Sequence, residues 1–370
     1  IYSHCHVNRS GSISIGRHFL FRSLMKIAMT HVDLPNEFKA GVANQAHYLA
    51  NELVERGHQV TMFTFSPAYS ECLYQVHQYP KFPPYLSKFK AFLFAGQLAK
   101  TNFSNFDILH THGDSYLVWG KHPHLRTFHG AAQDEAKTAV RFRRRLYQTV
   151  MIGLEQLNAQ VADLSVGVSQ TTQDRIPLVS SIIPCGVNVR QFHPGTKSDH
   201  PTVLFVGTKT GRKRGSFLAE VFTNEIRATV PNAELWTVAD QSMDGEGIIN
   251  FGKVSLEKLS ELYQRAWVFC MPSLYEGFGV PYVEAMASGT VVVTSHNPGA
   301  QEVLAGGKYG ILAADKILGQ RIINFLQDQD LRAFYEQQGL LRAQDFSWES
   351  VVQRYETLYQ DLIDRFQKVS

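Results

Sequence analysis

The sequence has few cysteines, no long apolar run and little net charge, and each of these absences excludes a class of protein. Its four cysteines lie far apart, without the paired spacing of a zinc site or a disulfide framework, which favours a reducing cytosol: Cys5, Cys72, Cys185 and Cys270. No apolar run approaches the roughly 18–20 residues that a membrane-spanning helix needs. A formal charge of +3 over 370 residues gives no indication of a nucleic-acid partner.

What is present is the composition of a globular protein that is long enough for two domains. Hydrophobic residues make up 44% of the chain and charged residues 19%. A strand at 26–30, a helix with one apolar face from Val42 to Leu53 and a strand at 59–65 predict a βαβ unit, which favours a parallel sheet. Further strands are predicted at 107–110, 125–128, 164–168 and 181–183 and, after a polar segment at 195–200 that we interpret as a linker, at 203–206, 234–238, 248–251, 267–271 and 291–295. The sequence therefore predicts two α/β units.

The first 24 residues differ from the rest of the chain. Arg9, Arg17 and Arg22 interrupt them, so they lack the clean apolar core of a signal peptide. Because Met25 opens the first predicted strand, we expect an extension before an ancestral start at that methionine. The alternative is an ordinary N-terminal arm that packs on the first domain.

The segment between Glu276 and Glu284 is the most informative part of the chain. Pro281 suits the first turn of a helix and Gly289 suits the position just past its end, so the sequence predicts a short helix over about 280–288. The free N–H groups of such a helix would face outward near Gly279 and suit a phosphate. Two carboxylates beside an anion-binding helix terminus could hold sugar hydroxyls on either side of a diphosphate, which is the outline of a nucleotide-sugar pocket.

Four separated stretches resemble, in the same order, motifs of retaining glycosyltransferase family 4. The run from Pro272 to Gly289 resembles the family's motif of two glutamates separated by seven residues. The other stretches are Arg56-Gly57-His58 with Val60-Thr61, Ile183 to Asn188 with Phe192 and Pro194, and Phe346 to Glu349. The resemblance as a whole covers most of the chain, from roughly Met25 to Leu362.

The resemblance implies an α/β fold of the GT-B architecture, in which two Rossmann-like domains with parallel sheets face an interdomain cleft. It implies an N-terminal acceptor domain at 25–195 and a nucleotide-sugar donor domain at 196–345. A final helix within 346–370, whose apolar stripe begins at Trp348, would cross back to the first domain.

The same resemblance assigns roles to the glutamate segment. Glu284 matches the glutamate that accepts from the two ribose hydroxyls, and Glu276 matches the one near the transferred sugar, where we assign it to positioning and electrostatics. The backbone N–H groups of Phe278, Gly279 and Val280 would donate to sugar hydroxyls and phosphate. The alternative is that both glutamates merely cap helices.

The diphosphate would meet a basic loop after the first strand of the second unit. The family carries an arginine directly after a glycine there, and a lysine five residues later. Lys213 matches the lysine, but Thr208 stands in the place of the arginine, and Arg212 could reach the same phosphate from elsewhere in the loop. The alternative is a solvated basic turn. Gly41 matches the second of two glycines in a loop that approaches the diphosphate, with Ala40 in the place of the first.

Other positions have weaker or competing interpretations. Lys253 and Val254 lie where the family contacts the base. His129, in the run from Thr127 to Gly130, would bond a sugar hydroxyl or orient the acceptor, unless it is purely structural. Glu302 either assists the site or caps its own helix. Two groups resemble metal ligands but are interpreted otherwise: His110, His112 and Asp114 at a strand end, and Asp328 and Asp330 on the surface.

Two stretches bear on the acceptor. Phe89, Phe92 and Phe94 alternate with Lys88 and Lys90. A basic run follows further on, at Lys137, Arg141, Arg143, Arg144 and Arg145. Both could hold the first domain on an anionic membrane surface that carries a lipid-linked acceptor, or they could be solvated helix faces.

The function expected from the sequence is a metal-independent, retaining hexosyltransferase without a cofactor. Its donor would be a nucleotide diphosphate sugar, UDP-linked and glucose-like by preference, and its acceptor a polysaccharide or glycolipid. We expect a cytoplasmic location, peripheral at the inner membrane face. The alternatives are a sugar-nucleotide epimerase or phosphorylase of the same architecture and, because of Thr208 and Ala40, a non-catalytic nucleotide-sugar-binding or scaffold subunit.

Overall fold

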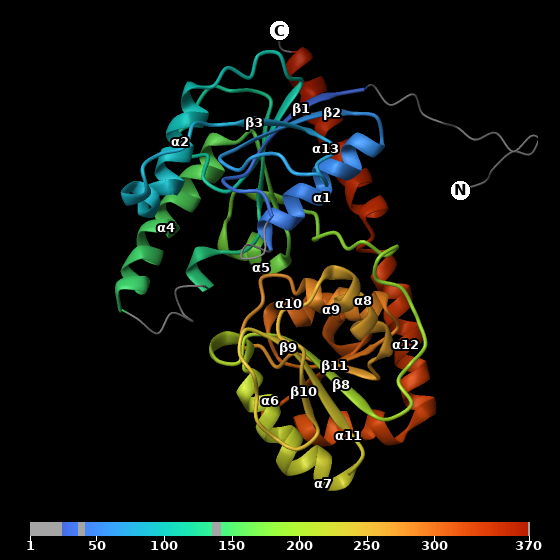
Figure 1. The fold of residues 1–370 in the computed structure, drawn as a ribbon. Coiled ribbons are helices and arrows are strands. Elements are labelled where there is room, and N and C mark those ends of the chain that lie inside the picture. Colours follow the sequence, from blue (N-terminus) through green and yellow to red (C-terminus); the bar gives the residue numbers. More distant parts are fainter. Residues whose placement is uncertain (1–23, 36–40, 135–141, 369–370) are drawn as a thin grey trace, which may run out of the picture.

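The structure is a computed structural model and describes residues 24–35, 41–134 and 142–368, with side chains from 149 in the last segment. Its two parallel sheets lie in separate halves of the molecule (Figure 1). Three of the positions discussed above fall outside the described residues: the extension before Leu24, Ala40, and the side chains of the basic run at 137–145. None of the described helices is long and apolar enough to cross a membrane.

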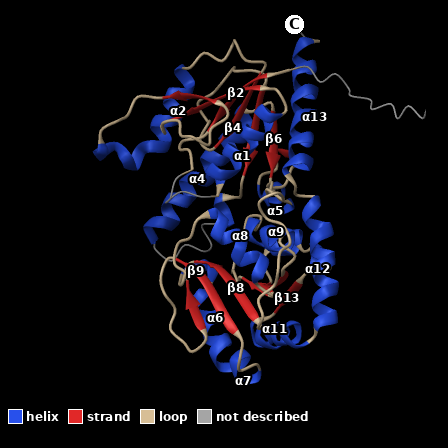
Figure 2. Ribbon diagram, turned by 45° about the vertical axis from the view of Figure 1, so that its right-hand side comes forward, coloured by secondary structure: helices blue, strands red, loops and turns tan. Residues whose placement is uncertain are grey.

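The first sheet has seven described strands in the order β3-β2-β1-β4-β5-β6-β7, and every adjacent pair is parallel. Its elements are β1 (Lys26–Thr30), α1 (Val42–Glu55), β2 (Gln59–Thr64), β3 (Gln75–Gln78), the 3₁₀ helix η1 (Pro84–Phe89), α2 (Lys90–Lys100), β4 (Ile108–His112), β5 (His124–Phe128), α4 (Phe142–Val161), β6 (Leu164–Gly167), α5 (Gln170–Arg175) and β7 (Val179–Ile182). Helices cover both faces of the sheet, as a parallel sheet requires (Figure 2).

The second sheet has six described strands in the order β10-β9-β8-β11-β12-β13, again all parallel. Its elements begin with β8 (Thr202–Gly207), η2 (Gly211–Lys213), α6 (Gly215–Val221), the π-helical turn η3 (Phe222–Ile226), α7 (Arg227–Thr229), β9 (Glu234–Ala239), β10 (Ile248–Asn250), α8 (Leu256–Arg265) and β11 (Val268–Cys270). They continue with α9 (Val280–Ala287), β12 (Val291–Ser295), α10 (Pro298–Val303), η4 (Ala305–Gly307), β13 (Ile311–Ala313), η5 (Asp315–Ile317), α11 (Leu318–Gln327), α12 (Gln329–Gln344) and α13 (Trp348–Gln367).

The expected strands are present within about three residues at each end, and two further strands were missed. β3 and β13 lie at sheet edges. β3 alternates polar residues on an exposed edge, and β13 has three residues, so neither carries the apolar run that marks a central strand.

Helix α13 returns from the second half to the first. Trp348, Val351, Tyr355 and Tyr359 belong to the core beneath β1 and β4. Buried Glu356 anchors the helix, because its two carboxylate oxygens lie 3.1 Å from Arg56 Nη1 and 3.1 Å from His58 Nε2. Figures 1 and 2 show α13 running along the first half and α12 along the second.

The polar segment at 195–200 lies against the second sheet rather than in open solvent. Lys197 Nζ donates to the carbonyl of Ala266 (2.9 Å) and to Thr290 Oγ1 (2.9 Å), and the Trp267 indole donates to the carbonyl of Ser198 (2.9 Å). We propose the domain limits 25–195, 196–345 and 346–370 from the expectation above, with this segment as the joint.

Candidate functional site

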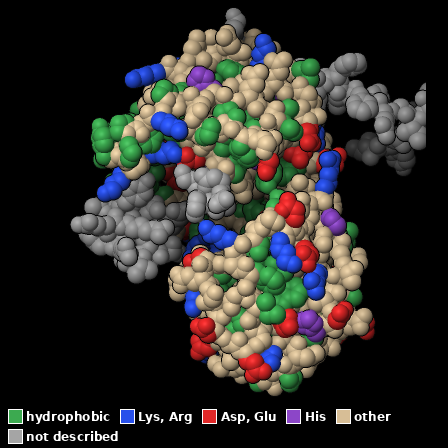
Figure 3. Space-filling model, in the orientation of Figure 1, with side chains coloured by type: hydrophobic (Ala, Val, Ile, Leu, Met, Phe, Trp, Pro, Cys, Tyr) green, Lys and Arg blue, Asp and Glu red, His purple; other side chains and the backbone are tan. Residues whose placement is uncertain are grey.

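The two halves meet where the glutamate segment faces the end of β5. A Cβ atom added to Gly277 would lie 3.1 Å from the carbonyl oxygen of His129 and 3.6 Å from the Cα of Gly130. One added to Gly130 would lie 4.0 Å from the Tyr275 hydroxyl. The structure therefore brings the expected residues His129 and Glu276 to one place, and Figure 3 shows a recess between the two halves there.

The predicted helix after this segment is α9, and its glycines are required by the backbone. Gly279 precedes the helix with φ +101°, and a Cβ there would lie 2.4 Å from the Tyr282 ring. Pro281 occupies the first turn and Gly289 follows the last with φ +66°. No side chain caps the first turn. Pro281 has no N–H and the N–H of Tyr282 donates to the carbonyl of Gly279 (2.9 Å), so an anion at this terminus would meet the N–H groups of Gly279 and Val280.

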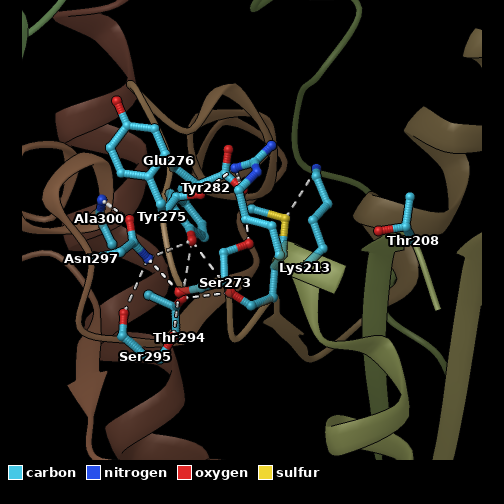
Figure 4. Close-up of polar contacts among 12 residues, drawn as sticks. Thr208, Lys213, Ser273, Tyr275, Glu276, Tyr282, Thr294, Ser295, Asn297 and Ala300 are labelled. Atoms are coloured by element: carbon cyan, nitrogen blue, oxygen red, sulfur yellow. Dashed lines mark hydrogen bonds and ion pairs between the residues drawn. The ribbon is translucent and has the colours of Figure 1, made fainter. Parts of the chain in front are cut away.

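Glu276 is buried and held from two sides (Figure 4). Its Oε1 accepts from Ser273 Oγ (2.8 Å) and lies 2.7 Å from Arg212 Nη1. Arg212 also donates to the carbonyl of Tyr275. Arg212, which could replace the missing family arginine, is thus paired with Glu276, the glutamate expected beside the sugar.

A hydrogen-bonded scaffold fixes the loop that carries Glu276, and the sequence interpretation missed it. Ser295 Oγ (2.7 Å) and Asn297 Nδ2 (3.3 Å) donate to the carbonyl of Ser273. The N–H of Gly299 donates to the carbonyl of Glu276 (3.0 Å), and a Cβ on Gly299 would lie 2.4 Å from the Phe278 carbonyl. Asn297 before a proline is a recognisable helix N-cap, but nothing local indicates that the same amide also supports another loop.

Lys213 lies within the electrostatic reach of both glutamates, and its Nζ lies 3.4 Å from Met271 Sδ. Burial lowers the pKa of this lysine, and the charges of Glu276 and Glu284 oppose that shift. Thr208 turns into its own loop, since its hydroxyl donates to the carbonyl of Thr210 (2.9 Å). Figure 4 shows Thr208 on the far side of Lys213 from Glu276, so the threonine does not take the arginine's place.

Glu284 is the most strongly perturbed carboxyl group of the site. Burial raises its pKa to about 7, while a hydrogen bond from Tyr263 and the charge of Lys213 act in the opposite direction. The Tyr263 hydroxyl donates to Glu284 Oε2 at 3.0 Å. A carboxyl group with this pKa changes its charge near neutral pH.

The opposite wall, on the first half, is a chain of neutral histidines. His129 Nε2 lies 2.9 Å from His112 Nδ1, and burial and the charges of Arg126 and His31 lower the pKa of His129 to about 3. His110 pairs instead with the Tyr359 hydroxyl (2.6 Å) and Thr127 Oγ1 (2.8 Å). The described residues contain no group of three His, Cys, Asp or Glu side chains that could hold a metal ion.

The remaining residues that were expected to contact the donor lie at the start of α1 and before α8. Gly41 precedes α1 with φ +81°, and Lys253 and Val254 lie in the loop before α8. Burial, and then the charges of Glu71, Glu284 and Glu257, raise the pKa of Tyr48 on α1.

Glu302 does not cap its own helix, because Asn297 is the N-cap of α10. Glu302 Oε2 accepts from the backbone N–H of Gln170 at 2.8 Å, so it caps α5 of the other half. The unpaired amides at a helix N-terminus attract a carboxylate from any direction, which sequence spacing cannot indicate. Asp328, expected on the surface, caps α12 by accepting from the Leu331 N–H (2.8 Å).

Comparison with known proteins gives relatives over most of the chain. It is 33% identical over 163 residues to O-antigen chain mannosyltransferase B of Escherichia coli, a match covering 40% of this chain and 42% of that protein. It is 26% identical over 364 residues to the phosphatidyl-myo-inositol mannosyltransferase of Mycolicibacterium smegmatis, covering 86% and 90%.

Solved structures share the fold. Sucrose-phosphate synthase from Thermosynechococcus elongatus superimposes with a TM-score of 0.72 at 24% identity, covering 92% of this chain and 100% of that one. Anabaena HepE in complex with UDP-glucose gives a TM-score of 0.69 at 15% identity, covering 91% and 100%. These likenesses confirm the predicted α/β GT-B architecture with two parallel sheets.

Two family models match successive parts of the sequence. The model of Glycosyltransferase Family 4 matches residues 40–191, and that of Glycosyl transferases group 1 matches residues 200–328. Each match falls on one of the two sheets, and together they include both glutamates and the basic loop. The chain therefore belongs to the group 1, family 4 retaining glycosyltransferases, enzymes that use nucleotide-sugar donors.

Proposed function

We propose that the protein transfers a glucose-like hexose, with retention, from a UDP-linked donor to a polysaccharide or lipid-linked saccharide. The observation that carries this proposal is the convergence of Arg212, Lys213, Glu276 and Glu284 at the open N-terminus of α9, opposite His129. Two cations and a helix terminus suit a diphosphate, and two carboxylates suit the hydroxyls on either side of it.

In this proposal the protein's own cations stabilise the leaving phosphate. Lys213 and Arg212 would bind the diphosphate, and Arg212 would exchange its present bond with Glu276 for a phosphate oxygen. The backbone of Phe278, Gly279 and Val280 would donate to phosphate and sugar. Attack on the same face as the departing phosphate, as the family resemblance implies, leaves Glu276 to position the sugar.

The other donor contacts follow from their places around this centre. Glu284 would accept from the ribose hydroxyls, Gly41 would let the backbone of the first domain approach the diphosphate, and Lys253 and Val254 would contact the base. His129, held neutral by burial, would bond a hydroxyl of the sugar or orient the acceptor.

Mannose is the second candidate sugar. Both relatives described above are named mannosyltransferases, whereas the HepE structure contains UDP-glucose. The choice between the two sugars depends on contacts with the sugar hydroxyls, so a donor panel has to include both.

A thermal-shift panel of UDP, GDP, ADP and CMP without added metal tests the donor site. One nucleotide should stabilise the wild type, by roughly 2.7 kcal/mol at a hundredfold excess over its Kd. Glu284→Ala should remove the shift. Glu246→Ala, on an exposed side chain of the same domain, should retain it. No shift with any nucleotide contradicts the donor-site proposal.

The acceptor face of the first domain supports peripheral membrane contact in a form different from the one expected. Phe94 is fully buried and Lys90 pairs with Asp33, so neither is available to a membrane. Tyr85 (77% exposed), Phe89 (55%) and Phe92 (41%) are the apolar side chains that project from η1 and α2. Figure 3 shows hydrophobic side chains at this edge of the first domain, with basic ones beside them.

Liposome flotation tests this contact. Binding should require anionic lipid, because exposed Lys88 lies within the same segment, and it should weaken in Tyr85→Ser/Phe89→Ser. Leu341→Ser, at an exposed apolar position of the second domain, serves as the control. Binding that is indifferent to lipid charge would contradict the proposal.

A further inference from the structure

Glu284 has a buried partner that the proposed function does not assign. The Tyr263 hydroxyl donates to its Oε2 at 3.0 Å, from α8 to α9. Tyr263 is fully buried, so this hydroxyl is not available to solvent or to a donor molecule. One of the two carboxylate oxygens of Glu284 is therefore already committed to the protein.

Tyr263 is itself held firmly in place. Its ring packs against Phe192 at 5.7 Å and against Phe269 at 5.4 Å between centroids. Its carbonyl accepts from Thr290 Oγ1 at 2.5 Å, and Thr290 Oγ1 also accepts from Lys197 Nζ at 2.9 Å. A side chain fixed at the ring and at the backbone directs its hydroxyl at a single point, which is what a positioning residue requires.

We propose that Tyr263 is a positioning residue for the nucleotide donor: by occupying Oε2 of Glu284 it leaves Oε1 to accept from the ribose hydroxyls, so the site selects ribonucleotides over their 2′-deoxy counterparts. The inference rests on the nucleotide-sugar site proposed above. Within that site, it names the group that makes the carboxylate selective for ribose.

The protonation of Glu284 provides a second way to test the role of Tyr263. Among the described residues, Tyr263 from α8, Lys213 from η2 and Tyr48 from α1 are titratable groups that interact with Glu284. The Tyr263 hydroxyl and Lys213 lower the pKa of Glu284 against the effect of burial, which raises it to about 7. Without the hydroxyl, Glu284 should keep its proton to a higher pH. Ribose selection should then appear only at that higher pH.

Calorimetric titration with UDP, GDP and ADP, each beside its 2′-deoxy form, tests the inference between pH 6 and 9. The wild type should prefer one ribonucleotide over its deoxy form by roughly tenfold, the worth of a hydrogen bond to a charged group. Tyr263→Phe should abolish most of that preference at pH 7 and shift its appearance to higher pH. Tyr79→Phe, which loses a buried hydroxyl bonded to Thr101 at 2.6 Å in the first domain, is the matched control.

Two further variants separate positioning from a structural role. In a Glu284→Gln background, Tyr263→Phe should change the ribose preference no further. Fluorotyrosine at position 263, with its more acidic hydroxyl, should shift the appearance of the preference to lower pH, and this test stands even if Tyr263→Phe does not fold. Equal losses of ribo and deoxy affinity in Tyr263→Phe would overturn the inference. If no nucleotide binds the wild type, the proposed function itself fails.

Discussion

The two walls of the cleft are built in opposite ways. The wall from the second domain is charged and compact in the sequence: Arg212 and Lys213 lie in one loop, and Glu276 and Glu284 border another. The wall from the first domain is made of buried histidines with lowered pKa values, and one of them, His110, takes its partner Tyr359 from α13, about 250 residues further along the chain. The comparison indicates a division of labour, in which one wall supplies charge for a diphosphate and the other supplies hydrogen bonds whose geometry depends on the distant helix.

Removing the residue that anchors α13 should produce the largest difference in effect between the two walls. Glu356→Ala removes a buried carboxylate that lies 3.1 Å from buried His58 and from half-buried Arg56, which should cost about 3 kcal/mol of first-domain stability. Urea unfolding monitored by fluorescence measures this loss. Glu349→Ala, exposed on the same helix, should unfold like the wild type. If the free energy of nucleotide binding by the second domain fell by as much as the free energy of unfolding, the two walls would not be independent.

Removing a cation from the charged wall should affect catalysis rather than stability. Lys213→Ala should lower turnover of the preferred donor by roughly 10²–10³-fold, because the leaving phosphate loses a buried positive partner. Release of free nucleotide from the donor reports the rate. The exposed Lys316→Ala controls for net charge. If turnover fell by less than about threefold, Arg212 and the N-terminus of α9 would be sufficient to stabilise the leaving phosphate.

The walls should respond to pH in opposite directions. The pKa of Glu284 is raised from 4.5 to about 7 on folding, so its contribution to stability falls as pH rises through that window. The pKa of His129 is lowered from 6.5 to about 3, so its contribution is lost as pH falls through that window. A difference of one between the folded and unfolded pKa of a group changes the free energy of unfolding by about 1.4 kcal/mol.

A plot of melting temperature against pH from 4 to 8 should therefore differ from that of the wild type on only one side, acid or alkaline, in each variant. Glu284→Gln should flatten the decline towards alkaline pH, and His129→Gln should flatten the decline towards acid pH. Identical pH profiles in both variants and the wild type would contradict the assignment of these shifts to the two walls.

The smallest effect should come from the contact that joins the domains through a helix terminus. Glu302→Gln removes the charge that faces the Gln170 N–H, which should cost about 0.3–1 kcal/mol. The loss should diminish at high salt. Differential scanning calorimetry at two ionic strengths measures it, with Glu246→Gln as the exposed control. A salt-independent change would indicate lost packing instead.

The same comparison explains how far the sequence could be interpreted. The central strands, helix α9 with Pro281 and Gly289, and the candidate residues of the charged wall could all be proposed from it, because each depends on neighbours within about a dozen positions. Tyr263, Asn297 and the real role of Glu302 could not. Their partners are brought together only by packing between elements, so no local pattern of residues reveals them.

Thr208 illustrates the remaining limit. The sequence showed that the family arginine is missing, but whether a neighbouring residue replaces it depends on where a long side chain ends. Arg212 reaches Glu276 because η2 turns it towards the loop after β11, and Thr208 turns away. Spacing along the chain carries no information about that turn.

The contact of Gly277 with His129 and Gly130, between the two domains, involves no side chain on either side. Gly277 has none, and what it faces is the main-chain oxygen of His129. Main-chain atoms on both sides therefore determine the distance between the domains at this point. Substitutions elsewhere in the cleft can change its chemistry without changing that distance. Gly277→Ala would add one methyl group at this contact. It could change the distance between the two walls without changing any residue that binds the donor.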